Sequence, residues 1–248
     1  MFYKKLYENF LTLAKENDLL DKNIAIQTHV LKPTEAIGTP DRKDFPLLKG
    51  KEVLMQALFM GMQGQAYTDA PSKFSGPLRK IMDLNLDDSR QRALFIAALN
   101  AVMRYVYPDI TTVHCKNNEP DECARKIVEF IQTLNPVSVG LIGLQPAILE
   151  ALVNRFGAEK IICIDRDEEN RGLTKYGVPI EWGDDKGMEK LFSRSNLVLP
   201  TGSSVVNGSL ADILTAAQKH DTPVYFYGTS VSGCARLMGL NHLCFKST

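Results

Sequence analysis

An excess of charge of one sign and long hydrophobic runs are both missing from this 248-residue sequence. Its 29 basic residues (Lys and Arg) balance 29 acidic ones, so the formal net charge is zero. Without a basic surplus the chain lacks the electrostatic footprint of a protein that binds nucleic acid or an anionic membrane. No run approaches the roughly 20 apolar residues of a membrane-spanning helix, and the charged stretch Met1–Asn17 is unlike a signal peptide. We expect a cytoplasmic protein with neither nucleic acid nor a membrane as partner.

Paired cysteine motifs are also missing. The five cysteines stand at positions 115, 123, 163, 234 and 244, and no two have the C-x-x-C spacing of a zinc ribbon or a thioredoxin-type site. Their small, odd number favours reduced thiols in a reducing compartment. Cys123, within a helical pattern, and Cys163, on an apolar strand, are expected in the core.

The first half of the sequence predicts a small α+β domain. Apolar residues at helical spacing or in strand-like alternation define its elements, and Asp87 and Asp88 are candidate caps for the longest helix. Pro, Gly and Asp mark turns over 33–50, and the stretch 61–76, which has no period, is interpreted as a shaped loop. The expected helices are 2–14, 89–104 and 120–134, and the expected strands are 23–30 and 52–60.

From Pro136 onward the pattern changes to short apolar strands that alternate with helices. Such alternation is typical of a parallel sheet covered by helices on both faces. We therefore expect an α/β protein in which residues 1–135 form the α+β domain and residues 136–248 form a Rossmann-like domain. The expected strands are 137–142, 160–164, 178–182, 196–199 and 223–227, and the expected helices are 146–156, 186–192 and 210–220.

In such a sheet a ligand lies beyond the carboxyl ends of the strands, and the first strand here runs into a glycine turn, Gly140–Gln145. Backbone N–H groups at the start of the next helix could hold an anion there. The turn lacks the full G-x-G-x-x-G pattern of a dinucleotide site. Its two glycines, Gly140 and Gly143, could equally serve only to allow a tight turn.

An acidic turn, Asp165–Asp167, follows the second expected strand. An acid about 20 residues after the glycine turn suits the hydroxyl pair of a ribose, as in nucleotide and S-adenosylmethionine binders. The alternatives are a helix cap or a solvated turn.

Small polar residues follow the fourth and fifth expected strands. Glycines let the backbone approach a ligand while hydroxyl and amide side chains donate hydrogen bonds to it. Asn207 or Ser209 could also cap the following helix. Together with the two turns above, we expect one cofactor or ligand site bordered by Gly140, Gly143, Asp165, Thr201, Gly202, Ser203, Asn207, Gly228 and Thr229.

The first domain is expected to complete this site. Asp69 and His114 are the predicted proton-transfer groups, because an edge of small residues offers few groups that exchange protons near neutral pH. The predicted substrate contacts are Gln65, Tyr67, Thr68 and Asn100. The 65–69 segment could instead pack only on its own strands, and the amide of Asn100 could satisfy an internal network.

His114 and Cys115 form the one place where two metal-capable side chains adjoin. Imidazole and thiolate suit a soft or borderline metal. No third ligand is identifiable from the sequence, so metal ligation by His114 is a hypothesis that stands beside its role in proton transfer.

Three segments, 64–68, 97–101 and above all Thr201–Gly208, resemble the prokaryotic family described as putative heavy-metal chelation proteins. The resemblance covers the chain from about Ile24 to its end. It implies an enolase N-terminal-like domain before the Rossmann-like domain, a site in the cleft between them that partly resembles methyltransferase cofactor pockets, and chemistry on pterin-, flavin- or siderophore-like chelators. Where the family would have Gly-Pro-Ser after the fifth strand, this chain has Gly228–Ser230, so the contact at Thr229 could differ.

Three functions stay open. One is an enzyme that acts on a small polar heterocycle or chelator, another is a non-catalytic metal- or chelate-binding protein, and the third is an S-adenosylmethionine-dependent methyltransferase. No nucleophile–base pair supports the first, and the shortened glycine turn and the missing base after the fourth strand disfavour the third. The cofactor stays open between a divalent metal and a nucleotide-like compound. The expected partner is a small molecule or metal chelate, with a homodimer open as the assembly.

Overall fold

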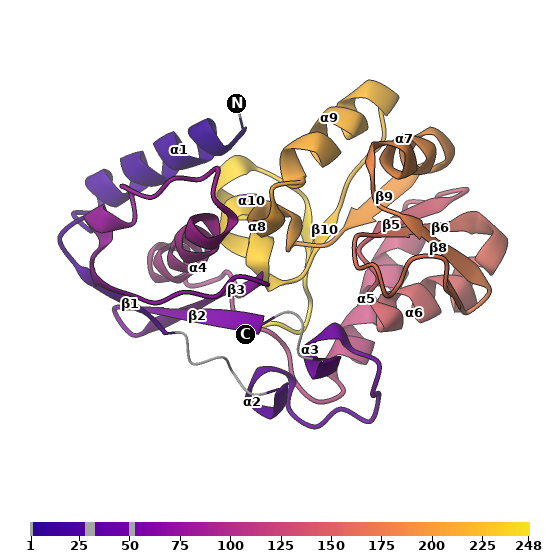
Figure 1. Ribbon diagram of the computed structural model, residues 1–248, viewed down its shortest axis with the longest axis horizontal. Helices are drawn as coiled ribbons and strands as arrows, with labels where there is room; N and C mark the ends of the chain where they lie inside the picture. The colour runs from indigo at the N-terminus through magenta and orange to yellow at the C-terminus, as the bar shows by residue number, and fades with distance from the viewer. Residues whose placement is uncertain (1, 28–32, 50–52) are drawn as a thin grey trace.

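The computed structural model describes residues 2–27, 33–49 and 53–248 and is built around two β-sheets (Figure 1). The first sheet has four strands in the order β3-β2-β1-β4, all antiparallel. The second has five in the order β7-β8-β6-β5-β9, parallel except for β7. The expected α/β fold class is confirmed.

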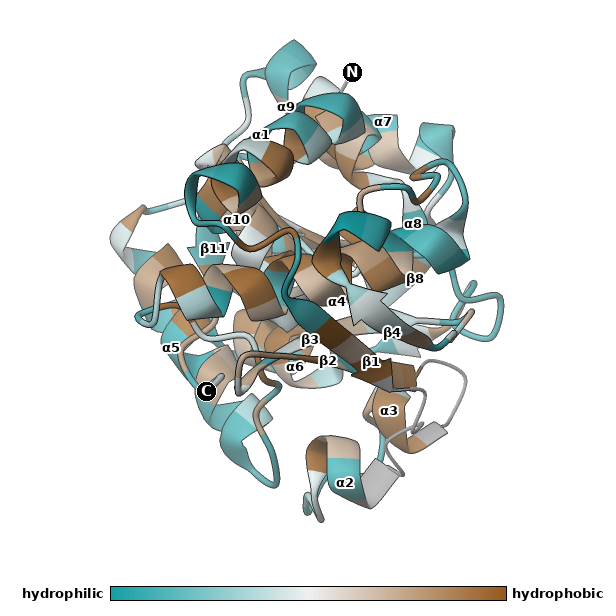
Figure 2. Ribbon diagram, turned by 90° about the vertical axis from the view of Figure 1, so that its left-hand side faces the viewer, coloured by the Kyte–Doolittle hydropathy of each residue, from teal (hydrophilic) through white to brown (hydrophobic). Residues whose placement is uncertain are grey.

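The first sheet is covered by one long helix that is buried along its middle. The sheet comprises β1 (Asn23–Gln27), β2 (Val53–Phe59), β3 (Met62–Thr68) and β4 (Phe74–Pro77). Helix α4 (Ser89–Val106) contacts β2 and β3, and Asp88 caps it by accepting the N–H of Gln91 at 2.8 Å. Every residue of α4 from Arg92 to Met103 is buried, as expected of a helix that is covered on all sides. Helix α1 (Phe2–Glu16) lies beyond α4, and its alternating brown and teal residues in Figure 2 mark it as amphipathic.

The stretch 61–76, interpreted from the sequence as a loop, forms strands β3 and β4, so that prediction is wrong. Small residues hide the strand pattern: a Cβ atom on Gly64 would lie 2.1 Å from the backbone nitrogen of Ala101 on α4. The expected turns over 33–50 contain two short helices, α2 (Pro33–Ile37) and α3 (Pro46–Lys49). Residues 28–30 and 52 of the expected strands lie outside the described residues.

The second sheet and the helices around it contain most of the elements that the sequence predicts, together with β7, α8, α10 and β11, which it does not predict. Its core strands β5, β6 and β9 are almost entirely buried, with α5 and α6 on one face and α7 and α9 on the other (Figure 1). Single bridges from Val224 and Tyr227 place β10 beside β9, and β11 pairs with β10. The elements are α5 (Glu119–Thr133), β5 (Val139–Ile142), α6 (Pro146–Phe156), β6 (Ile161–Asp165), β7 (Thr174–Lys175), β8 (Val178–Trp182), α7 (Asp185–Arg194), β9 (Leu197–Pro200), α8 (Ser204–Asn207), α9 (Leu210–His220), β10 (Phe226–Tyr227), α10 (Ser232–Met238) and β11 (His242–Leu243).

Contacts cross the predicted domain boundary at residue 135 in both directions. Helix α5, which precedes it, packs on α6 of the second sheet, and α10, which follows it, packs on α4 and α1. One hydrophobic core cluster therefore contains residues from both halves of the chain. The boundary at residue 135 stays a prediction. Within the described ranges, no helix has the length and apolar character that crossing a membrane requires.

Candidate functional site

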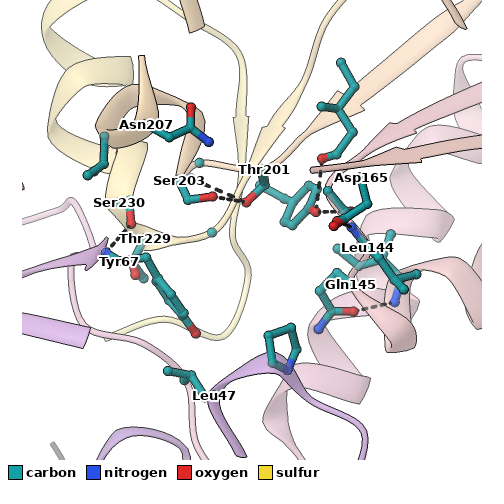
Figure 3. A pocket seen from close by; sticks show the side chains of 18 of the residues that line it. Leu47, Tyr67, Leu144, Gln145, Asp165, Thr201, Ser203, Asn207, Thr229 and Ser230 are labelled. Carbon is teal, nitrogen blue, oxygen red and sulfur yellow. Dashed lines mark hydrogen bonds between the residues drawn. The ribbon is translucent and has the colours of Figure 1, made fainter. Parts of the chain in front are cut away.

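A cavity of about 600 Å³ lies where the carboxyl ends of β5, β6, β9 and β10 face strand β3 of the first sheet (Figure 3). This volume suits a drug-sized ligand. The cavity brings together most of the residues that the sequence predicts for a site. Those that line it are Tyr67, Thr68, Asp69, His114, Gly143, Asp165, Thr201, Gly202, Ser203, Asn207, Gly228 and Thr229.

One wall of the cavity carries small hydroxyl groups from the turns after β9 and β10 (Figure 3). The hydroxyl oxygens of Thr201 and Ser203 lie 3.1 Å apart, and Ser230 accepts the backbone N–H of Tyr67 at 2.9 Å. Thr229 is buried, and its Oγ1 has no hydrogen-bond partner among the described residues. A buried hydroxyl without a partner is a candidate group for binding a ligand.

Asn207, at the end of α8, lies on the rim of the same wall (Figure 3). Its Oδ1 accepts hydrogen bonds from the backbone N–H and the hydroxyl of Ser209, at 3.0 and 2.8 Å. Asn207 therefore shapes the turn before α9 but does not cap the helix, whose N-cap residue Ser209 makes no side-chain capping hydrogen bond, and the Asn207 side chain still borders the cavity.

The opposite wall is apolar. It consists of Phe45, Pro46 and Leu47 around α3, Ala124 and Ile127 on α5, and Leu144 and Ile148 at α6. The sequence does not predict this wall, because Pro, Gly and Asp mark the segment 33–50 as turns. The apolar run Phe45–Leu48 between those turns is the signal that could have identified it.

Arg42 holds this segment in place. Its Nε donates to Asp121 of α5 at 3.0 Å, and its Nη1 donates to the hydroxyl of Tyr176 at 2.8 Å. It also forms an ion pair with Glu150 of α6. Arg42 therefore joins the apolar wall around α3 to helices α5 and α6, which cover the second sheet.

The turn that leads into α6 binds the side chain of Asp165. The backbone N–H of Leu144 donates to Asp165 Oδ2 at 2.5 Å, and the side chain of Gln145 caps the N–H of Ile148 at 2.8 Å. Asp165 Oδ1 also accepts the N–H of Asp167 at 2.6 Å. The glycine turn therefore binds a carboxylate of its own chain where a dinucleotide site would bind phosphate.

The charged side chains around the cavity are mostly acidic. Asp69, Asp165 and Asp167 line it, against one guanidinium, Arg166. The Nε of Arg166 donates to the carbonyl oxygen of Gly183 at 2.9 Å. A surplus of carboxylates repels phosphates and other polyanions.

His114 stands beside Tyr67, with the two rings edge to face and their centroids 5.7 Å apart. Burial lowers the pKa of His114 to about 4, because the charged imidazolium loses its hydration. Its Nδ1 is buried and has no hydrogen-bond partner among the described residues. At neutral pH the ring is uncharged and able to accept a proton. No group of three or more His, Cys, Asp or Glu side chains that could hold a metal ion occurs in the part of the chain that the structure describes.

Three of the five free cysteines, Cys115, Cys123 and Cys244, also line the cavity. Cys123 is buried, as expected, yet it borders the cavity as well. A hydrogen bond from the Cys244 thiol holds the pKa of Cys123 below that of an ordinary thiol and raises the pKa of Cys244. Cys163 and Cys234 are buried in the cores. The sequence does not predict that Cys123 and Cys244 line one cavity, because only the fold brings these distant positions together.

Three predicted site residues do not line the cavity. Gly140 faces α7, where a Cβ atom would lie 2.7 Å from the side chain of Leu191. Gln65 is buried; its side chain donates to Gln56 at 2.9 Å and accepts the backbone N–H of His114 at 2.7 Å. Asn100 is fully buried in a network of hydrogen bonds to main-chain atoms. Gln65 and Asn100 lie behind the cavity lining, where their hydrogen bonds hold the segments that form it.

Comparison with known proteins finds a likeness to one family in the C-terminal half of the chain. Residues 126–243 match the sequence model of the family described as "Putative heavy-metal chelation", as the resemblance implied. A protein of unknown function from Pyrococcus horikoshii is 16% identical over 91% of this chain and 79% of its own, with a TM-score of 0.55. Another, from Desulfitobacterium hafniense DCB-2, is 14% identical over 75% of this chain and 72% of its own, with a TM-score of 0.51. Both are assigned to the same family, and at these identities the likeness shows the fold alone. No curated protein matches.

Proposed function

We propose that this chain binds a small heterocyclic chelator or its metal complex in the cavity between the two sheets. The premise is the match of residues 126–243 to the putative heavy-metal chelation family. Pterin-, flavin- and siderophore-like compounds are the ligand class. The observation that carries this proposal is the contrast between the two walls of the cavity.

A planar heterocycle matches both walls. The aliphatic wall around Leu47 and Ile127 suits the face of a ring, which gains from leaving water. The hydroxyls of Thr201, Ser203 and Thr229 suit the polar edge of the same ring, where they donate and accept hydrogen bonds. A ligand of this shape would be held in one orientation.

The charges of the cavity favour an uncharged or cationic ligand. Asp165 accepts the N–H of Leu144 in the turn before α6, and Asp69 and Asp167 add negative charge. Pyrophosphate-containing cofactors are therefore disfavoured. S-adenosylmethionine, which carries no phosphate, stays a second candidate, because Asp165 borders the cavity at the position that binds ribose in other Rossmann-like proteins.

If the protein is an enzyme, we assign proton transfer to His114 and Asp69. Both line the cavity, and the His114 imidazole is uncharged above a pH of about 4. The neutral imidazole is the form that accepts a proton, and the lowered pKa makes His114 a weaker base than an exposed histidine.

Fluorescence titration with unsubstituted pterin tests the proposed ligand class. Pterin should bind and raise the melting temperature, whereas its 6-carboxylate and NAD should bind much more weakly. Thr229→Val removes the unpaired hydroxyl and should weaken pterin binding about tenfold, the loss of one hydrogen bond. Thr215→Val, on the exposed face of α9, is the control. Equal affinities for the wild type and Thr229→Val, or a preference for NAD, would contradict the proposal.

Location and assembly are proposed on separate grounds. Five free cysteines fit the reducing cytoplasm. A homodimer stays a prediction that light scattering during gel filtration can test.

A further inference from the structure

Residues 39–48, here called the strap, pass beside the cavity without joining either sheet. Among the described residues, no backbone–backbone hydrogen bond links the strap to another element. Its backbone is held by two side chains instead. Asn117 accepts the N–H of Thr39 at 3.0 Å, and Asn118 accepts that of Asp41 at 3.1 Å. Because such contacts can break while both sheets stay intact, the strap is able to open locally.

The inner face of the strap is apolar and closes one side of the cavity. Phe45 and Leu47 are buried, and together with Pro46 they line the cavity. Leu47 lies across the cavity from Ser203 (Figure 3). Phe45 and Leu47 also belong to the same hydrophobic cluster as Cys123 of α5. Movement of the strap away from α5 would therefore open the cavity and uncover the thiol of Cys123.

The outer face of the strap is charged. Arg42 contacts Asp121 of α5 at 3.0 Å and forms an ion pair with Glu150 of α6. A further ion pair, of 2.8 Å, joins Lys175 of β7 to Asp44 of the strap. These five side chains are 17–37% exposed, so salt in the solvent weakens their attraction without abolishing it.

The bonds of the outer face have to break together when the strap opens. One guanidinium holds α5 and α6 at the same time, so the strap leaves both helices in one step. The exposure of Phe45 and Leu47 to water adds to the cost of opening. Opening is therefore a rare local event, which still costs less free energy than unfolding of the whole chain.

We propose that the strap is the lid of the cavity and that Arg42 holds it closed. A ligand enters when residues 39–48 move away from α5 and α6, and the apolar inner face then returns over the ligand. The ion pairs of Arg42 and Asp44 set how often this happens.

The lid controls access to the cavity whatever the ligand is, so it can be tested without one. Failure of pterin binding leaves the lid standing. A strap that never opens separately from the rest of the fold leaves the pterin proposal standing.

Alkylation of the reduced, ligand-free protein with iodoacetamide, followed by peptide mapping, measures the opening. Cys123 lies beneath the strap, whereas Cys163 is fully buried on β6 and becomes reactive only when the whole fold opens. In the wild type Cys123 should therefore react faster than Cys163.

Arg42→Ala should speed the alkylation of Cys123 at least about tenfold, because hydrogen bonds between charged groups that hold the strap are lost. Lys175→Ala, which removes only the pair with Asp44, should speed it less. Sodium chloride at about 1 M should speed the reaction in the wild type more than in Arg42→Ala, because it screens the same ion pairs. Circular dichroism and the melting temperature check that each variant folds.

Two control variants separate opening of the strap from unfolding of the whole chain. Arg155→Ala removes an exposed arginine at the end of α6 and should leave both alkylation rates unchanged. Ile213→Val, in the other hydrophobic cluster, should speed Cys163 about fivefold and leave Cys123 unchanged. An unchanged rate at Cys123 in Arg42→Ala would overturn the proposal. So would a Cys123 rate that rises with that of Cys163 in Ile213→Val, because only global unfolding would then expose Cys123.

Discussion

The side-chain amide of Asn100 accepts the backbone N–H of Gly233 at 2.7 Å, across 133 positions of the sequence. Its Nδ2 donates to the carbonyl oxygens of Thr229 and Ser230 at 3.2 and 3.1 Å. It also donates to the carbonyl oxygen of Gln65 on β3, at 2.7 Å. One buried side chain thus joins α4, the first sheet and the turn that borders the cavity.

We predict that Asn100→Leu lowers the free energy of unfolding by about 3 kcal/mol or more, because several buried main-chain groups lose their partner at once. Urea denaturation measures this loss. The matched control is Asn9→Leu, since Asn9 makes one part-buried hydrogen bond, to the sulfur of Met238, and should cost less than about 1 kcal/mol. Equal losses in the two variants would show that Asn100 contributes no more to the free energy of unfolding than Asn9 does.

Gly64→Ala should destabilise the protein by about 3 kcal/mol, because the new methyl group would collide with the backbone of α4. The Cβ atom would lie 2.1 Å from the nitrogen of Ala101 and 2.6 Å from the carbonyl oxygen of Ala97, and backbone atoms cannot move aside as a side-chain tip can. Gly172→Ala, where φ is +76° and no atom lies within 4 Å, is the control for backbone strain alone and should cost about 1 kcal/mol. Thermal unfolding that ranks the control as the worse variant would refute the tight packing of β3 on α4.

Stability should fall as the pH drops through the window between about 6.5 and 4. The folded-state pKa of His114 is lowered to about 4, so in this window the unfolded chain binds the proton more readily than the folded one. The loss is expected to approach about 3 kcal/mol at the acid end. His242, whose pKa burial also lowers, contributes in the same direction. The test is the difference in unfolding free energy between wild type and His114→Phe, which should change with pH across this window; parallel curves would show that His114 does not titrate as expected.

Asp165→Ala should open an anion site that the wild type lacks. Removal of the carboxylate frees the N–H of Leu144 at the start of α6, at a cost of about 2 kcal/mol in stability. Inorganic phosphate should then raise the melting temperature of the variant and leave that of the wild type unchanged. Asp69→Ala removes the same charge from the cavity without freeing that N–H, so it controls for charge alone. A phosphate response in Asp69→Ala as large as in Asp165→Ala would point to charge, not to the helix start.

The sequence predicts the second sheet far better than the first. Its buried parallel strands are continuous apolar runs such as Val139–Ile142, and the pattern alone identifies them. The sequence does not predict strand β3, because its residues Gly64 and Ala66 are small and remove the alternation of large apolar residues that marks a strand. The close packing of α4 on β3 requires a small residue at position 64. That constraint comes from tertiary packing, so the local sequence of β3 does not reveal it.

For the candidate site, the strand-end residues were predictable because the topology of a parallel sheet collects them at one edge. The positions of Thr201 and Gly228 follow from that rule. The joint lining of the cavity by Cys123 and Cys244 does not follow, because no local pattern relates two residues so far apart in the sequence. For Asp165 the sequence offers a helix cap or a solvated turn as alternatives to ligand binding, and only the structure shows that it accepts the N–H of Leu144.

Residues 229–248 supply hydrogen-bond partners to the first half of the chain, and this has a consequence for biosynthesis. On the ribosome, α4 emerges long before the segment 229–233 that completes the bonds of Asn100, and Val113 emerges long before Thr248. Until residues 229–248 leave the exit tunnel, the long apolar helix α4 remains partly uncovered, the condition under which nascent chains aggregate or recruit chaperones. The first half is therefore expected to reach its final fold only in a late step, the docking of α10 and of residues 244–248.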